Sequence, residues 1–162
     1  VPIVNKTQDI HLKGEEYLTF EVQPFLRVEL DDTPMISDGV ITARVKVDRG
    51  VSKDDFKKVL AQTGDYSDSY LNMTDIQLFV SYSSSCGYRA RDERWSNEIL
   101  YSGKAFETQF GKTITITSNP KNPIPSGRKV FIRAAARINY DTPAGSGTRR
   151  WNYSEVVEVD IP

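Results

Sequence analysis

Apolar and polar side chains alternate along most of this chain, and a period of two is the pattern of β-strands that bury one face. The longest alternating runs cover residues 40–47, 75–82, 129–140 and 154–161, and shorter ones cover residues 25–30, 99–101 and 112–117. Turn-forming residues separate the runs, most clearly in the proline-rich stretch 118–127. Strands at this density, with turn signals between them, predict an all-β sandwich.

The alternation also predicts which side chains form the core. In the run 75–82, Ile76, Leu78, Val80 and Tyr82 fall on one face, which we expect to point inward. The apolar faces of the later runs should pack against it in one two-sheet core. That core would contain Ile76, Leu78, Val80, Val130, Ile132, Ala134, Val157 and Val159.

One short helix interrupts the β pattern. Ser52 is a good N-cap, and Asp55 three residues later approximates a capping box. Phe56, Val59 and Leu60 then recur at helical spacing and form one apolar stripe. Gly64 is expected to end the helix, which we predict over residues 52–62.

The beginning of the chain has the pattern of a separate unit. Leu18, Phe20 and Val22 alternate with polar residues, and Pro24 then interrupts the run. We therefore interpret residues 1–23 as the final hairpin of a preceding β-domain, or as an N-terminal extension, and residues 24–162 as the sandwich domain.

Charge and composition exclude several classes of function. With 21 Lys+Arg against 22 Asp+Glu the chain has a formal net charge of −1, and therefore no basic excess with which to hold a nucleic acid. Its longest apolar runs are far shorter than the ~18 residues of a membrane-spanning helix. The single Cys86 excludes a disulfide within the chain and a multi-cysteine metal site, and the single His11 excludes most imidazole chemistry. We expect no cofactor and no metal.

Nucleophilic catalysis is not supported by the residues present. Residues 83–87 contain three serines and Cys86, but a nucleophile needs a base within hydrogen-bonding reach, and His11 belongs to the preceding segment. We expect Cys86 to be a free thiol that is neither a metal ligand nor a nucleophile.

Acidic residues raise two further possibilities. Asp92 with Glu93, Glu98, or Asp65 with Asp68 could formally supply the two carboxylates of a glycoside hydrolase, although 22 acids produce such pairs by chance. Asp65, Asp68 and Asn72 could also offer oxygen ligands to calcium, but not at EF-hand spacing. A solvated loop is the simpler interpretation, and we predict no catalytic residue.

Aromatic residues in the connections are the most informative feature for function. Tyr66 and Tyr70 lie in one connection, and two mixed clusters of aromatic and charged residues occupy 88–95 and 149–153. Aromatic planes and planar hydrogen-bonding groups on loops could bind a carbohydrate. The candidate ligand-binding residues are Tyr88, Trp95, Arg150, Trp151, Asn152 and Tyr153. The alternative is that Trp95, Trp151 and Tyr153 cap the sandwich core with arginines stacked over them.

The end of the chain resembles the final hairpin of a fibronectin type III domain, in residues 130–136 (VFIRAAA) and 153–159 (YSEVVEV). The tryptophan usual on an early strand of that family is absent from residues 40–47, and Val130 stands where its corner tyrosine is expected. The resemblance implies an immunoglobulin/fibronectin type III-like sandwich in which the short helix is an insertion.

A second resemblance covers more of the chain. Residues 17–28 (YLTFEVQPFLRV) are similar to a junction in an uncharacterised family of Bacteroidetes surface lipoproteins associated with starch-utilisation-type glycan uptake loci, and the strands at 41–47 and 75–80 also suit that family. The resemblance implies that this chain is the C-terminal fibronectin-like domain of such a protein. It also implies export to the outer membrane on a lipid-modified cysteine upstream of Val1, and that anchor would be the sole contact with the membrane.

These observations lead to three interpretations of function. The first is a non-catalytic cell-surface binding or accessory module that assists glycan capture, with a polysaccharide or outer-membrane glycan-uptake proteins as partners. The second is a structural spacer or protein-interaction domain that binds no sugar. The third is a glycoside-processing enzyme. Exposure of Trp95 and Trp151 would favour binding, and their burial would favour the spacer.

Overall fold

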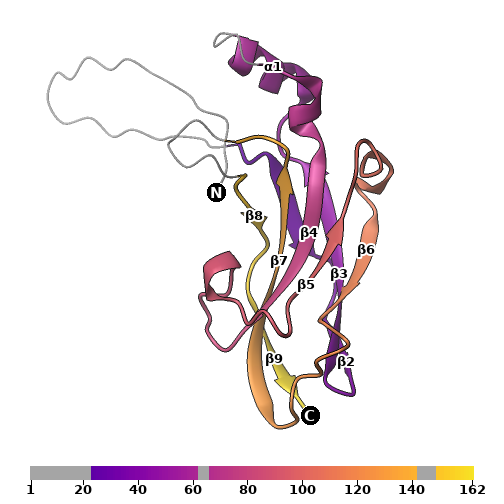
Figure 1. The fold of residues 1–162 in the computed structure, drawn as a ribbon, viewed down its shortest axis with the longest axis vertical. Helices are drawn as coiled ribbons and strands as arrows, with labels where there is room; N and C mark the ends of the chain where they lie inside the picture. Colours follow the sequence, from indigo (N-terminus) through magenta and orange to yellow (C-terminus); the bar gives the residue numbers. More distant parts are fainter. Residues whose placement is uncertain (1–22, 62–65, 142–148) are drawn as a thin grey trace, which may run out of the picture.

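The computed structural model describes residues 23–61, 66–141 and 149–162. The segment interpreted as a preceding hairpin, residues 1–23, therefore lies outside the described residues except for Gln23. The described residues form two antiparallel sheets packed face to face, with one short helix at one end of an elongated body (Figure 1).

The smaller sheet is built around one long strand. β3 (Val40–Arg49) pairs along one edge with both β1 (Leu26–Leu30) and β2 (Met35–Ser37), and along the other edge with β6 (Thr113–Thr117). The first two strands thus act as one edge strand, interrupted around Pro34, which cannot donate a ladder hydrogen bond.

The larger sheet has the order β5-β4-β7-β8, with β9 on the same edge of β7 as β8. Its strands are β4 (Met73–Ser81), β5 (Asn97–Leu100), β7 (Arg128–Ile138), β8 (Asn152–Tyr153) and β9 (Val157–Ile161). The chain moves between the two sheets repeatedly, which is how an immunoglobulin-like sandwich is connected. The predicted all-β sandwich with one short helix is confirmed.

The predicted core is largely correct. Of its eight residues, seven are buried, and Val157 is half-buried against the same core. Tyr82 was predicted wrongly: β4 ends at Ser81, and the Tyr82 side chain is 50% exposed at the end of the sheet. Its ring still contacts the core through the edge of Trp95, at 5.0 Å between centroids.

A β-bulge breaks the alternation at the start of β4. Asp75 pairs with Arg137 in regular register, but Met73 pairs with Ile138, so that Thr74 is an extra residue. The extra residue reverses the facing of everything before it. Met73 therefore enters the main core, whereas Asp75, two residues later, points to the outer face of the sheet.

The helix begins as the sequence predicted. Ser52 Oγ accepts a hydrogen bond from the Asp55 backbone N–H at 3.1 Å and donates one to the Asp55 carboxylate at 2.7 Å, which is the predicted capping interaction. α1 (Lys53–Ala61) buries Phe56 and Leu60 at one end of the core. The predicted end at Gly64 lies outside the described residues. The 3-10 helix η1 (Asp68–Leu71) leads into β4.

The hairpin between β2 and β3 was not predicted, although its signal is in the sequence. Asp38 and Gly39 both have positive φ, 50° and 74°, as a tight two-residue turn requires. A Cβ atom at Gly39 would lie 2.4 Å from the Ile124 carbonyl oxygen, so this position needs glycine for space as well as for conformation. The Ile124 N–H donates back to the Gly39 carbonyl at 2.8 Å, which fixes the proline-rich connection against the hairpin.

No helix among the described residues is long and apolar enough to cross a membrane.

The two-sheet core predicts the effect of a charge on β7. Ile132 is fully buried between the sheets, so Ile132→Asp would place an unpaired carboxylate there and should prevent cooperative folding. Thr115→Asp, at an exposed position of β6, is the matched control and should cost less than about 1 kcal/mol of unfolding free energy. Circular dichroism during thermal unfolding measures both. A parental melting curve for Ile132→Asp would contradict this register.

Candidate functional site

The outer face of the larger sheet carries a second apolar layer. Phe79 and Ala135 point away from the main core, because their sequence neighbours fill its inner side, yet both are fully buried. They form a separate buried group, here named the outer cluster, made of Phe79, Cys86, Ala135 and Trp151. The sequence contains a signal for it that simple alternation misses: residues 78–80 and 134–136 are apolar without interruption, as in a strand buried on both faces.

The connection that follows β4 folds back over this face. The thiol of Cys86 donates to the Phe79 carbonyl oxygen at 3.5 Å, and the Tyr88 backbone N–H donates to the Tyr153 hydroxyl at 3.4 Å. Tyr88 begins the short 3-10 helix η2 (Tyr88–Ala90), and its ring lies 6.4 Å from that of Phe79. The connection is therefore fixed to the sheet by side chains of β4 and β8.

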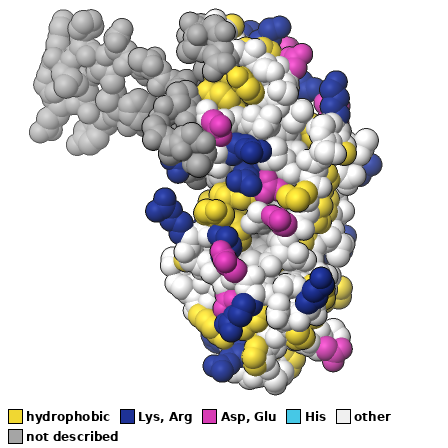
Figure 2. All heavy atoms as spheres, in the orientation of Figure 1, with side chains coloured by type: hydrophobic (Ala, Val, Ile, Leu, Met, Phe, Trp, Pro, Cys, Tyr) yellow, Lys and Arg dark blue, Asp and Glu magenta, His cyan; other side chains and the backbone are white. Residues whose placement is uncertain are grey.

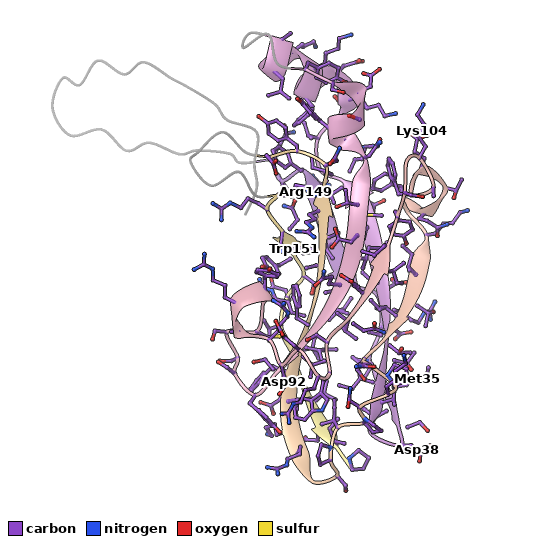
Figure 3. The ribbon with its side chains drawn as sticks, in the orientation of Figure 1. Met35, Asp38, Asp92, Lys104, Arg149 and Trp151 are labelled. Atoms are coloured by element: carbon purple, nitrogen blue, oxygen red, sulfur yellow. The ribbon has the colours of Figure 1, made fainter. Side chains whose placement is uncertain are left out.

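Aromatic rings and guanidinium groups form a continuous stack on this face. The rings of Tyr88 and Trp151 are stacked at 6.1 Å with 28° between their planes. The Arg91 guanidinium lies 4.3 Å from the Tyr88 ring centroid, and that of Arg137 lies 4.1 Å from the Trp151 ring. The order Arg91, Tyr88, Trp151, Arg137 is a run of cation–π and ring contacts. Figure 3 shows Trp151 beside β7, on the side of the molecule that carries η2.

A buried carboxylate fixes one end of the stack. The Asp75 side chain is 1% exposed and accepts hydrogen bonds from Arg137 Nε at 2.7 Å, Gln77 Nε2 at 3.1 Å and Thr74 Oγ1 at 2.6 Å. These donors compensate the charge that burial would otherwise penalise. Gln77 Nε2 also donates to Glu98 at 2.8 Å, so the network extends from the stack to the exposed edge strand β5.

The structure brings together three of the six predicted binding residues. Tyr88, Trp151 and Tyr153 all belong to the outer face, and they are respectively 46% exposed, 7% exposed and half-buried. Basic and acidic side chains alternate over this side of the molecule with apolar patches between them, so neither charge dominates it (Figure 2). Arg150 is exposed at the start of the same segment.

Two predicted residues point elsewhere, which corrects the expectation that both loops display their aromatics. Trp95 is 3% exposed and belongs to the main core, on the other side of the sheet from the outer cluster. Asn152 is 2% exposed, and its Oδ1 accepts a hydrogen bond from the Leu26 backbone N–H at 3.3 Å, which joins the two sheets. Because successive strand residues face opposite sides, Asn152 cannot share the face of Trp151 and Tyr153.

The alternative interpretation of the aromatics is correct for Trp95, which packs in the main core, whereas Trp151 and Tyr153 pack in the separate outer cluster. Each of the predicted aromatic residues has a guanidinium over its ring: Arg94 lies 4.9 Å from Trp95, and Arg133 lies 4.5 Å from Tyr153. The Tyr88 ring stacks against the Trp151 indole and the Arg137 guanidinium lies over it, so the indole offers little free surface. Tyr88 is the exposed ring of the stack. Whether any of these residues binds a ligand stays a prediction.

The pKa shifts of Asp92 and Cys86 are opposite to those that a general acid and a thiol nucleophile need. Hydrogen bonds from Arg94, at 3.0 and 2.7 Å, lower the pKa of Asp92, whereas a glycosidase general acid needs a raised one. Glu93 pairs with Arg91 at 2.8 Å. Burial raises the pKa of the Cys86 thiol to about 11, which suppresses the nucleophilic thiolate.

Asp68 and Asn72, two of the three candidate calcium ligands, line one groove in the described part of the chain. Asp65 lies outside the described residues, and Asp68 accepts a hydrogen bond from the Tyr66 hydroxyl at 2.8 Å. Within residues 23–61, 66–141 and 149–162, no three histidine, cysteine, aspartate or glutamate side chains are grouped as metal ligands would be.

Comparison with known structures shows similarity to proteins of Bacteroides. The chain is 64% identical to a DUF3823 family protein from Bacteroides uniformis, with a TM-score of 0.84, over 88% of this chain and 58% of that one. At 18% identity and a TM-score of 0.57 it shares its fold with a "putative carbohydrate binding protein" from the same organism, over 88% of this chain and 60% of that one. A DUF3823 family protein from Bacteroides ovatus shares the fold at 15% identity and a TM-score of 0.58, over 100% of this chain and 71% of that one.

These findings fit an uncharacterised Bacteroidetes family, as the resemblance in the sequence implied. The chain spans about 60% of the length of the first two of these structures. None of the three names describes an enzyme. No protein-family model and no curated protein matches the chain.

The two tryptophans should behave as packing residues in unfolding experiments. Trp95→Ala and Trp151→Ala should each lower the unfolding free energy by about 3–5 kcal/mol, the usual cost of emptying a buried indole site. Tyr88→Ala, which removes a half-exposed ring from the same stack, should cost less than about 1.5 kcal/mol. Urea unfolding followed by circular dichroism compares the three variants. Similar costs for Tyr88→Ala and Trp151→Ala would contradict the burial described here.

The raised pKa of Cys86 predicts a loss of stability in alkali. The native thiol stays protonated up to a pKa of about 11, whereas the unfolded thiol ionises near its ordinary value of 9.0. The contribution is therefore fully present below pH 9 and is lost as the pH rises from 9 toward 11. The stability difference between the parent and Cys86→Ala, measured by urea unfolding, should shrink over that range. A constant difference would show that the thiol has an ordinary pKa when folded.

Proposed function

We propose that this chain is a non-catalytic cell-surface module that assists glycan capture, and that the outer face of its larger sheet is the contact surface. The observation that carries the proposal is the half-exposed Tyr88 ring within the stack. The ring is held in a fixed position because Trp151 stacks against it and the Arg91 guanidinium lies over it. Rigid aromatic rings with nearby hydrogen-bonding groups are the usual elements of small-molecule and sugar sites.

The physical basis of recognition would be shared between the ring and the polar groups around it. The apolar C–H face of a sugar can pack against the exposed part of the Tyr88 side chain, whose ring lies between Trp151 and Arg91, and this costs little ordering because the ring is already fixed. Gln77, Glu98 and Arg137 are partly exposed beside the stack and can orient hydroxyl groups by donating and accepting hydrogen bonds. Their mutual hydrogen bonds hold them in place before a ligand arrives.

The comparisons support the proposal at the level of the fold. One structure with this fold is named for carbohydrate binding, and its identity to this chain is 18%. The non-catalytic part of the proposal is supported by the paired state of Asp92 and Glu93 and by the protonated thiol of Cys86. Export to the outer membrane on an upstream lipid anchor, and glycan-uptake proteins as partners, belong to the same proposal by resemblance.

A second candidate function is favoured by a specific observation. Both tryptophans are buried, at 3% and 7% exposure, and a domain that serves only as a spacer would bury its aromatics in this way. In that case the arginine–aromatic stack would stiffen the sheet and bind no sugar.

Substitution of the exposed ring separates the two functions. Tyr88→Ala should weaken binding of a polysaccharide by about 1–3 kcal/mol, as for anchor residues at interfaces. Tyr82→Ala is the matched control, because Tyr82 is also about half exposed but lies off the outer cluster. Affinity electrophoresis across bacterial, plant and host polysaccharides, followed by calorimetry, makes the measurement. If no polysaccharide binds the parent chain, the spacer function stands. If one binds and both variants retain full affinity, the site does not include the Tyr88 ring on the outer face.

A further inference from the structure

A polar groove lies at the α1 end of the molecule, away from the outer cluster. It has a volume of about 230 Å³ and is lined by three separate segments. α1 contributes Lys53 and Lys57, Tyr66 precedes η1 and Asp68 begins it, and the connection from β5 to β6 contributes Lys104 and Glu107. In Figure 3, Lys104 extends from that connection toward the end of the molecule where α1 lies.

Contacts between the lining residues fix part of the groove. Lys53 pairs with Glu107 at 3.2 Å, which joins α1 to the β5–β6 connection. The Tyr66 hydroxyl donates to Asp68 at 2.8 Å, and Lys57 Nζ lies 5.6 Å from the centroid of the Tyr66 ring. The tyrosine ring is thus a fixed wall with an ammonium group beside it.

Other polar groups in the groove remain available to a ligand. Asp54 and Asn72 complete the lining. In the described part of the chain, the side chains of Asp54, Asn72 and Lys104 have no hydrogen-bond or ion-pair partner. Between them they offer a carboxylate, an amide and an ammonium group, so a ligand would have to donate as well as accept hydrogen bonds.

The charge of the groove favours a ligand with one negative charge. Arg49 lies behind the lining, close enough for its charge to act on Glu107 and Tyr66, while burial lowers its own pKa. With Lys53, Lys57 and Lys104 it makes four cations, against the three carboxylates of Asp54, Asp68 and Glu107. The lining itself is balanced, with three ammonium groups against three carboxylates, and the one positive charge in excess is that of Arg49 behind it, whose guanidinium donates to the Leu71 carbonyl oxygen at 3.1 Å. A dianion such as phosphate would meet three carboxylates, and a neutral ligand would leave the excess unused.

We propose that this groove binds a single hexuronate unit, either the free sugar acid or one unit of an acidic polysaccharide. The sugar carboxylate accepts from the Lys104 ammonium, the hydroxyls exchange hydrogen bonds with Asp54 and Asn72, and the ring lies against Tyr66. The volume is below the roughly 300 Å³ at which drug-sized pockets begin, so the groove takes one unit and not an oligosaccharide. The groove shares no residue with the outer cluster, so this inference does not depend on the function proposed for that face.

The test is an amide-resonance titration of the intact chain with sodium glucuronate and sodium galacturonate, and with glucose and inorganic phosphate at matched ionic strength. Either uronate should give saturable shifts confined to α1, η1 and the β5–β6 connection, with glucose and phosphate binding at least about fivefold more weakly. A further titration with a short oligogalacturonate distinguishes the two sources. The same shifts with the oligomer indicate that the groove accepts one unit of a polysaccharide, and their absence indicates that it takes the free sugar acid.

Lys104→Ala should weaken uronate binding by about two- to fivefold, because an exposed ion pair contributes a factor of that order. Lys121→Ala removes another exposed lysine outside the groove and should leave binding unchanged. The inference is overturned if neither uronate saturates, if phosphate or glucose binds as well, or if Lys104→Ala and Lys121→Ala behave alike. Tyr88→Ala should not affect uronate binding. A wrong assignment of the glycan site on the outer face and a wrong assignment of the groove therefore give different results.

Discussion

The pairing of β4 with β7 is the constraint on which the rest of this structure depends. From Asp75 to Ser81 the two strands stay in unbroken antiparallel register, and they lie in the interior of the larger sheet. Because side chains alternate across a sheet, this register decides at once which residues enter the main core and which enter the outer cluster. Leu78 and Ala134 face each other on one side, and Phe79 and Arg133 on the other.

Because β4 and β7 are buried on both faces, their outer side chains must be covered by the long connections of the chain. A strand pair with an apolar outer residue needs a cover, and the connection after β4 supplies one through Cys86 and Tyr88. The Asp75 carboxylate, on the same face, is buried only because Arg137, Gln77 and Thr74 all donate to it. Removing Arg137 would leave the Asp75 carboxylate without its counter-charge, which costs more than the ion pair contributes. Packing and electrostatics on this face therefore cannot vary independently.

The sequence predicts the strands and the main core well because their signal is local. Alternation over five to eight residues identifies the inward face without any knowledge of pairing. It fails at Met73, where a bulge reverses the facing, and at Tyr82, where the strand has already ended. The candidate site is harder to predict because its signal is not local. Trp95 and Trp151 lie in similar polar surroundings in the sequence, and the return of one connection over the sheet decides which core each joins. The uninterrupted apolar residues 78–80 are the local signal that such a cover was needed.

The placement of the first and last described strands has a mechanical consequence. β1 begins at the α1 end of the long axis and β9 ends at the opposite tip (Figure 1). Tension applied between these two points would run along the strands, so the five residue pairs of β1 with β3 and the five of β9 with β7 would be loaded together in shear. Ladders loaded in this way break as a set, whereas ladders pulled across their strands open one bond at a time. The sandwich is thus oriented to resist stretching along its length.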